Sequence, residues 1–60
     1  MNTAKVMELI ANGAIIEGFG RESYLVHSSF RNGKRKLGSM IYWAVWSKCE
    51  KEKINFPKAA

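Results

Sequence analysis

Short turn signals interrupt this chain at close intervals, and their spacing limits it to small secondary-structure elements. The interruptions are Asn12-Gly13, Gly20, Asn32-Gly33 and Gly38-Ser39. The first and last segments that they leave suit helices, whereas the segments between suit strands. With 60 residues there is room for one domain around one small core. We therefore predict a single small α+β domain over residues 1–60.

The first segment predicts a short helix from Thr3 to Asn12. Asn2 or Thr3 can cap its N-terminus, because side chains of this type accept a hydrogen bond from a free backbone amide. Apolar residues from Val6 to Ile10 then recur at helical spacing. Gly13 can adopt the left-handed conformation that often follows a helix, so the helix is expected to end there.

The middle of the chain predicts an antiparallel meander of two to three strands. The first strand is expected at Ala14–Phe19, and Gly20–Glu22 would reverse the chain. The second strand is expected at Ser23–Arg31. Asn32-Gly33 is typical of a two-residue type I′ hairpin turn, because both residue types tolerate positive φ. A short third strand, Lys34–Leu37, would then lie antiparallel to the second.

Residues 40–53 allow two interpretations. As a helix, they follow an N-cap at Ser39 and form one broad apolar stripe: Ile41, Tyr42, Val45, Trp46 and Cys49. As a strand, the run MIYWAVW has high β-propensity. The length of the segment and its polar end, KCEKEK, favour the helix. The predicted order is helix, antiparallel β-hairpin or meander, and helix, with both helices on one face of the sheet.

Positive charge is concentrated in the second half of the chain. Residues 1–30 carry two cationic and three acidic side chains, whereas residues 31–60 carry eight cationic and two acidic ones. This asymmetry favours an anionic partner: nucleic acid, an acidic protein surface or a lipid headgroup. The alternative is a surface charge that serves only solubility.

The sequence argues against an enzyme. His27 is the only histidine and Cys49 the only cysteine, so neither a two-histidine nor a cysteine-rich metal site can form. The serines near His27 point to the other face of the strand or lie a full pleat away, and no carboxylate is placed to orient the ring. The glycines match no nucleotide-binding fingerprint. We predict no catalytic residue, no metal, no cofactor and a buried, unreactive Cys49.

A cytoplasmic location is expected. A single cysteine allows no internal disulfide, whereas small secreted domains usually depend on several. The N-terminal stretch MNTAKVMELIANG lacks the pattern of a signal peptide. The longest apolar run, Met40–Trp46, is far shorter than the roughly 20 residues that cross a bilayer, so no membrane partner is expected.

Two functions compete, and a small toxin-like nuclease is a third alternative. The first is a small basic, non-enzymatic module that binds nucleic acid, either DNA or RNA, through the cationic β-hairpin. The cations expected to contact phosphates are those of the hairpin and two on the last helix: Arg31, Lys34, Arg35, Lys36, Lys48 and Lys51.

The second function is a protein-binding regulator or inhibitor, of the kind that phages and mobile elements carry as accessory proteins. If residues 40–53 are helical, Met40 and Trp43 point away from the apolar stripe. Together with Trp46 they would contact a protein partner or a second copy of the chain in a homodimer.

The predicted order of elements in a small basic chain resembles that of HicA-type RNA-cleaving toxins. In that family the second strand begins with a Gly-Ser-His-type motif that bears the catalytic histidine. The matching stretch here is GRESY, residues 20–24, which has no histidine, and His27 lies too far along the chain. The resemblance therefore covers the layout alone and implies no cleavage activity.

Overall fold

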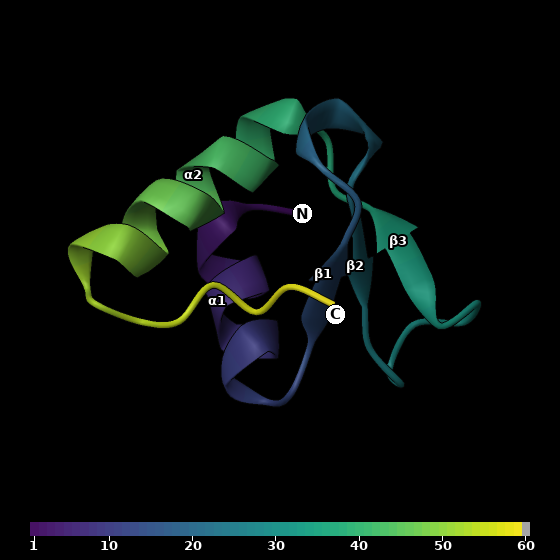
Figure 1. Ribbon diagram of the computed structural model, residues 1–60. Helices are drawn as coiled ribbons and strands as arrows, with labels where there is room; N and C mark the ends of the chain where they lie inside the picture. Colours follow the sequence, from purple (N-terminus) through teal and green to yellow (C-terminus); the bar gives the residue numbers. More distant parts are fainter. Residues whose placement is uncertain (60) are drawn as a thin grey trace.

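The computed structural model describes residues 1–59 and contains two helices and a three-stranded antiparallel sheet (Figure 1). This confirms the predicted α+β fold. The elements are α1 (Thr3–Ala11), β1 (Ile15–Glu17), the 3₁₀ turn η1 (Gly20–Glu22), β2 (Tyr24–Val26), β3 (Lys34–Lys36) and α2 (Ser39–Lys51). The strands follow one another across the sheet in the order β1-β2-β3. Both helices lie on the same side of this sheet, as predicted.

The ends of α1 follow the local signals in the sequence. The Asn2 side-chain oxygen accepts a hydrogen bond from the Lys5 amide at 2.9 Å, which caps the first turn. At the other end, the Gly13 and Ala14 amides donate to the carbonyls of Ile10 and Leu9. This is the Schellman pattern, and Gly13 has the φ of +99° that it requires.

The core lies between the helices and the covered face of the sheet. Ile16 and Leu25 are fully buried at the centre of the sheet and face each other in register across β1 and β2. The helices cover them with the remaining buried apolar side chains, among them Val6, Leu9, Tyr42, Val45 and Cys49. The cluster is small, so each of its members contributes a large share of the buried apolar surface.

The segment from residue 40 is a helix, which settles the choice between helix and strand. One detail of the prediction is wrong: Ser39 is the first residue of α2 and not its cap. Gly38 occupies the cap position with φ +83°, and its carbonyl accepts the Tyr42 amide at 2.9 Å. The helix ends at Lys51, and Lys53 follows in a left-handed conformation with φ +57°.

The predicted two-residue hairpin turn is also wrong. β2 ends at Val26 and pairs there with Lys34, so the loop between the strands spans residues 27–33. Gly33 has positive φ but Asn32 does not, so a type I′ turn is not formed. Instead, the Phe30 amide donates to the His27 carbonyl and the Gly33 amide donates to the Phe30 carbonyl, which makes two successive turns.

Tertiary contacts account for this longer loop. The Phe30 ring packs against the hydrophobic core, which it could not reach from an extended strand. The His27 ring lies 3.2 Å from the Asn12 carbonyl oxygen through Nε2, which ties the loop to the end of α1. These contacts override the local preference of Asn-Gly for a tight reversal.

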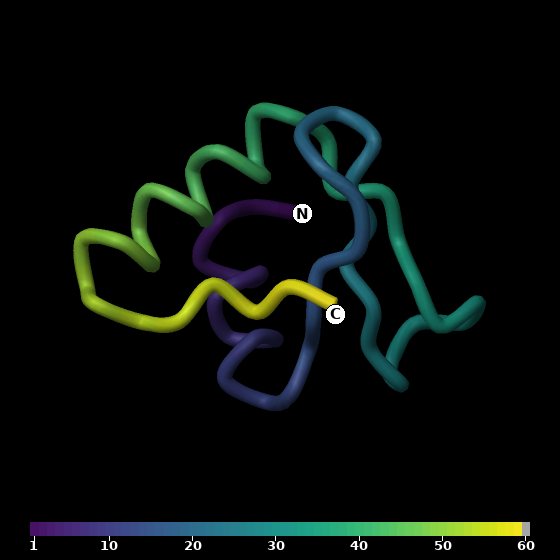
Figure 2. The backbone as a smooth tube through the Cα atoms, viewed as in Figure 1, coloured from purple at the N-terminus to yellow at the C-terminus, as the bar shows by residue number. Residues whose placement is uncertain are grey.

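The C-terminal tail covers the edge of β1 (Figure 2). The Ile16 amide donates to the Pro57 carbonyl at 2.6 Å, and the Ala59 amide donates to the Ile16 carbonyl at 2.9 Å. Lys58 therefore lies beside Ile16 as a short parallel bridge. The β1 edge is thus paired, whereas β3 forms the other edge of the sheet.

Candidate functional site

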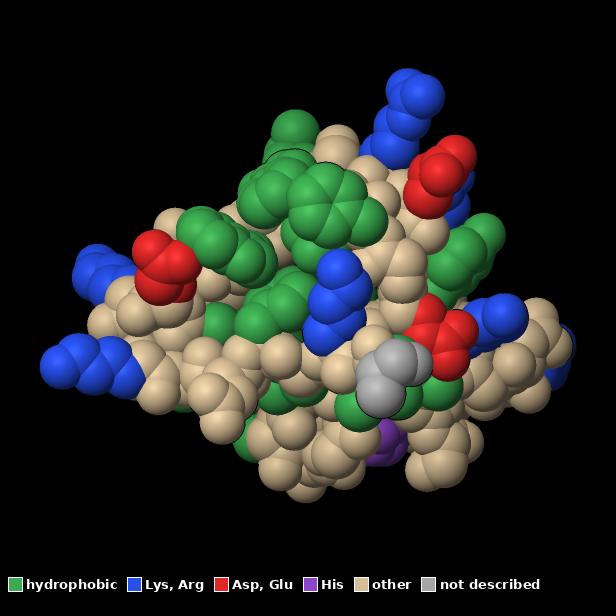
Figure 3. All heavy atoms as spheres, viewed as in Figure 1, with side chains coloured by type: hydrophobic (Ala, Val, Ile, Leu, Met, Phe, Trp, Pro, Cys, Tyr) green, Lys and Arg blue, Asp and Glu red, His purple; other side chains and the backbone are tan. Residues whose placement is uncertain are grey.

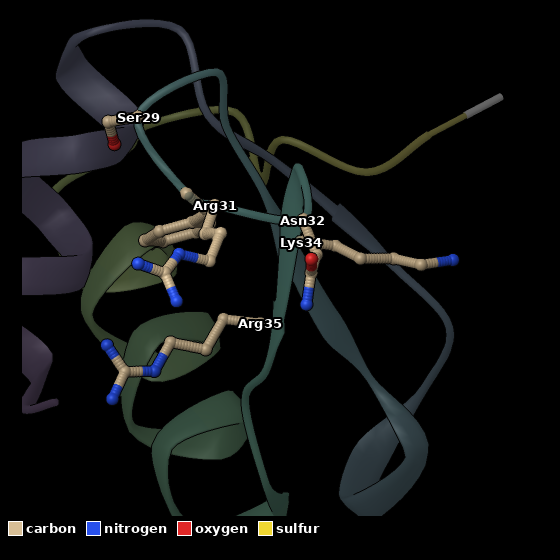
Figure 4. A pocket seen from close by; sticks show the side chains of 6 residues that line it. Ser29, Arg31, Asn32, Lys34 and Arg35 are labelled. Atoms are coloured by element: carbon tan, nitrogen blue, oxygen red, sulfur yellow. The ribbon is translucent and has the colours of Figure 1, made fainter.

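The register of the hairpin divides its cations between two faces. Lys36 pairs with Tyr24, Arg35 with Leu25, and Lys34 with Val26. Because neighbouring strand residues point to opposite faces, Lys34 and Lys36 share the face of Tyr24, whereas Arg35 shares the face of the buried Leu25. Figure 4 shows the Arg31 and Arg35 side chains extending to one side of the hairpin and Lys34 to the other.

The face that carries Tyr24 is not covered by a helix (Figure 1). Tyr24 and Ile15 remain 39% and 38% exposed on it, although both lie in strands. The Lys34 Nζ lies 5.5 Å from the centroid of the Tyr24 ring, which is a cation–π contact at an exposed position. We call this surface the open face: Ile15, Glu17, Tyr24, Val26, Lys34 and Lys36.

The cations of the hairpin have no carboxylate partner within the described residues. Among residues 1–59 the only ion pair joins Lys48 Nζ and Glu52 Oε2, at 4.0 Å. All three side chains of β3 are exposed, and so is Arg31. Charged side chains on an edge strand also discourage pairing with another sheet, which gives β3 a structural reason for its lysines. That reason does not extend to Arg31, which lies in the loop.

His27 organises the loop that precedes β3. Its Nδ1 accepts the Ser29 amide at 3.1 Å and lies 2.7 Å from the Ser29 hydroxyl oxygen. With Nδ1 as an acceptor, the proton is on Nε2, which donates to the Asn12 carbonyl. Both ring nitrogens are thus used in hydrogen bonds within the fold. The loop and β3 together form a shallow pocket, lined by Ser29, Phe30, Arg31, Asn32, Lys34 and Arg35 (Figure 4).

The two helix cations predicted to extend the site do not lie with the hairpin. Lys48 and Lys51 are in the last turns of α2, which lie across the molecule from β3 (Figure 2). They line a separate shallow depression on α2, and Lys48 is paired with Glu52. The structure therefore brings together four of the six predicted cations: Arg31, Lys34, Arg35 and Lys36.

A second surface is formed by exposed aromatic rings. Phe19, Trp43 and Trp46 are 61%, 44% and 39% exposed, and hydrophobic side chains gather over this part of α2 in Figure 3. The ring centroids are 5.2 Å apart for Phe19 and Trp43 and 5.9 Å apart for the two tryptophans. Met40 is 84% exposed at the start of the same helix. We call the rings of Phe19, Trp43 and Trp46 the aromatic cluster.

Two residues of these surfaces were missed from the sequence. Phe19 was expected inside the first strand, but β1 ends at Glu17, and Phe19 turns outward before η1. Tyr24 was expected in the second strand, and it lies there in the structure. The alternation alone could not identify which face the helices would cover, and the buried Leu25 settles it.

No group of three potential metal ligands is found among residues 1–59. Cys49 is buried, as predicted, and its Sγ lies 4.0 Å from the Met7 sulfur. Burial raises the pKa of the Cys49 thiol, and the negative charge of Glu52 raises it further. Neither helix in the described part of the chain has the length and apolar character that crossing a bilayer requires.

Comparison of the chain with family models, with curated proteins and with solved structures finds no match. The function must therefore be argued from the two surfaces themselves.

Proposed function

We propose that this protein is a non-enzymatic nucleic-acid-binding module that contacts phosphates through the β2–β3 hairpin. The observation that supports this most is the set of four cations held within six positions, all exposed and none paired with a carboxylate of the described chain. Phosphate neutralisation by such side chains supplies most of the affinity in non-specific nucleic-acid binding. The four residues are Arg31, Lys34, Arg35 and Lys36.

The arrangement suits an extended polyanion better than a small anion. Lys34 and Lys36 are two residues apart on one strand face, which separates their Cα atoms by about 6.6 Å. Arg31 and Arg35 extend on the other side of the same hairpin (Figure 4). The pocket beside them is open to solvent, so it does not surround a small ligand as an enclosed binding pocket does. A row of separated charges matches a ligand with repeated charges.

The test compares two variants with the same change in net charge. In the first, Lys34, Arg35 and Lys36 are replaced by glutamine, and in the control Lys48, Lys51 and Lys53 are replaced by glutamine. Binding of a labelled oligonucleotide at low salt is measured by fluorescence anisotropy, and circular dichroism verifies the fold. We expect the hairpin variant to lose at least about tenfold in affinity and the control less than about threefold.

Two outcomes would contradict the proposal. If both variants lose equally, only net charge matters, and the hairpin is not a site. If the unmodified protein binds neither DNA nor RNA at low salt, the cations serve solubility or protect the β3 edge. A loss in the control that exceeds about threefold but stays below that of the hairpin variant would show that Lys48 and Lys51 extend the contact, as the sequence suggested.

The aromatic cluster favours a second candidate function, a protein-binding regulator or inhibitor that uses Trp43, Trp46 and the neighbouring Phe19. Clustered exposed aromatic rings on a protein this small are typical of interaction surfaces. Self-association is the simplest form of this function. Sedimentation velocity at increasing concentration would detect it, and Trp43→Ser should abolish it. A monomer at every concentration would exclude the homodimer.

A further inference from the structure

We infer that the nucleic acid is single-stranded and that its bases lie on the open face of the sheet, with Tyr24 as the stacking side chain. This rests on the proposed function and names the class of ligand for the same hairpin. The experiment below separates the failure of this inference from the failure of nucleic-acid binding as such.

Tyr24 occupies the position that a stacking residue needs. It lies on the central strand, with Glu17 across from it on β1 and Lys36 across from it on β3. The ring is partly exposed, and Lys34 Nζ lies 5.5 Å from its centroid. An exposed cation–π contact of this kind is weak. A base can therefore take the ring face once the Lys34 ammonium turns to a phosphate.

The rest of the open face has the composition of a platform for a single strand. Val26 and the exposed Ile15 offer apolar surface next to the Tyr24 ring. Lys34 and Lys36 border that surface on the edge strand, where phosphates can reach them from solvent. Aromatic rings beside a row of cations are the usual means of binding single strands without sequence preference.

Stacking on an exposed ring discriminates against a duplex. The faces of paired bases are covered by their neighbours in the stack, so a side chain that does not intercalate cannot reach them. Tyr24 lies on the central strand of the sheet, flanked by β1 and β3, and not on a protruding loop that could enter between base pairs. A duplex would therefore meet only the lysines and arginines, whereas a single strand would gain the stacking contact as well.

The aromatic cluster is a poorer platform for bases. Its rings pack edge to face, with interplanar angles of 85° between Phe19 and Trp43 and 71° between Trp43 and Trp46. In each such pair the edge of one ring covers part of the face of the other. Lys58 Nζ lies 5.2 Å from the Phe19 centroid, but Lys34 and Lys36 of the hairpin share the face of Tyr24 and not the side of these rings.

Glu17 allows a test in which the variant is expected to gain affinity, so that a partly unfolded protein could not produce the expected result. Its carboxylate shares the open face and stands across from Tyr24, so it repels a phosphate chain that crosses this surface. Glu17 is exposed and forms no ion pair within the described residues. Glu17→Gln should therefore tighten binding of a single strand about two- to fivefold.

The experiment measures anisotropy of labelled oligothymidylate and of a duplex of equal length with four variants. They are Tyr24→Ala, Tyr24→Phe, Glu17→Gln and, as a matched aromatic control, Trp43→Ala. We expect the single strand to bind at least about fivefold more tightly than the duplex. Tyr24→Ala should lose about 5- to 150-fold for the single strand, the range that loss of one base–aromatic stack gives. It should leave duplex binding unchanged, and Tyr24→Phe should retain full affinity.

Equal binding of duplex and single strand, or no effect of Tyr24→Ala on the single strand, would overturn the inference while the proposed function stands. Loss of single-strand binding in Trp43→Ala instead of Tyr24→Ala would move the bases to the aromatic cluster and would also overturn it. If the unmodified protein binds neither oligonucleotide, the proposed function itself fails. Thermal unfolding of each variant verifies that affinity losses do not reflect unfolding.

Discussion

Gly18→Ala tests the turn that brings Phe19 to the surface and leads into β2. Gly18 has φ +85°, a conformation that residues with a Cβ adopt only at a cost. A Cβ at this position would lie 2.7 Å from the Glu22 carbonyl oxygen and 3.2 Å from the Ser23 Cα. Both are backbone atoms of the adjoining turn, so they cannot move aside as the end of a flexible side chain would.

Gly33→Ala is the matched control. Gly33 has a similar φ of +79°, but a Cβ there would meet no heavy atom within 4 Å. The control should therefore cost only the backbone strain, about 1–2 kcal/mol. Gly18→Ala adds the steric conflict with the turn, and we expect a total of about 3–4 kcal/mol. That is a large part of the roughly 3–9 kcal/mol that stabilises a domain of this size.

The assay is urea unfolding of both variants, followed by tryptophan fluorescence and circular dichroism. Since the free energy of unfolding of so small a domain falls by roughly 1 kcal/mol per molar urea, a difference of about 2 kcal/mol separates the two unfolding midpoints by about 2 M. An equal loss of stability in the two variants would refute the reasoning. It would mean that the turn relaxes to accept a Cβ and that Gly18 is required for its φ alone.

Three further predictions concern the loop, the thiol and the end of α2. His27→Ala should cost about 1–2 kcal/mol in unfolding free energy, because the Ser29 amide and the Asn12 carbonyl lose their partner, whereas the exposed Ser28→Ala should cost little. The raised pKa of Cys49 means that the folded state favours the neutral thiol. This stabilisation is fully present below the unfolded thiol pKa of about 8.5 and is lost as the pH rises through the higher folded pKa, so unfolding free energy should fall more steeply above pH 8.5 in the unmodified protein than in Cys49→Ala. Lys53→Gly should raise unfolding free energy by about 1 kcal/mol, since Lys53 follows α2 with φ +57° and glycine has no Cβ penalty there; an unchanged or lower value would contradict this.

The parts of the fold that could be predicted from the sequence are those set by local signals. The start of α1 depends on the Asn2 side chain, and its end depends on Gly13, both within a few residues of the helix they delimit. The helical state of residues 40–51 follows from length and from the apolar stripe that holds Val45 and Cys49. No knowledge of distant contacts is needed for either.

The hairpin could not be predicted in the same way, because distant contacts decide its loop. Asn32-Gly33 alone favours a two-residue turn, but Phe30 packs into the core and His27 bonds to the end of α1. His27 and Asn12, for example, lie 15 positions apart in the sequence. A single sequence does not show such contacts, and they shorten β2 to Tyr24–Val26.

The candidate site was predicted in composition but not in arrangement. Four neighbouring cations are visible in the sequence, and their exposure follows from their charge. Which of them share a face depends on the register, in which Arg35 stands opposite Leu25 and Lys36 opposite Tyr24. The contribution of Tyr24 to the cationic face therefore emerges only when the strands are paired.

The central claim is that the hairpin cations neutralise phosphates, and the salt dependence of binding tests it most directly. With four phosphate contacts, a plot of log Kobs against log salt concentration for a single-stranded oligonucleotide should have a slope of about −3. Replacement of Lys34, Arg35 and Lys36 by glutamine leaves Arg31 alone, so the slope should fall to about −0.7. An unchanged slope in that variant would show that the phosphates are bound elsewhere on the protein, and the account of the hairpin would be wrong.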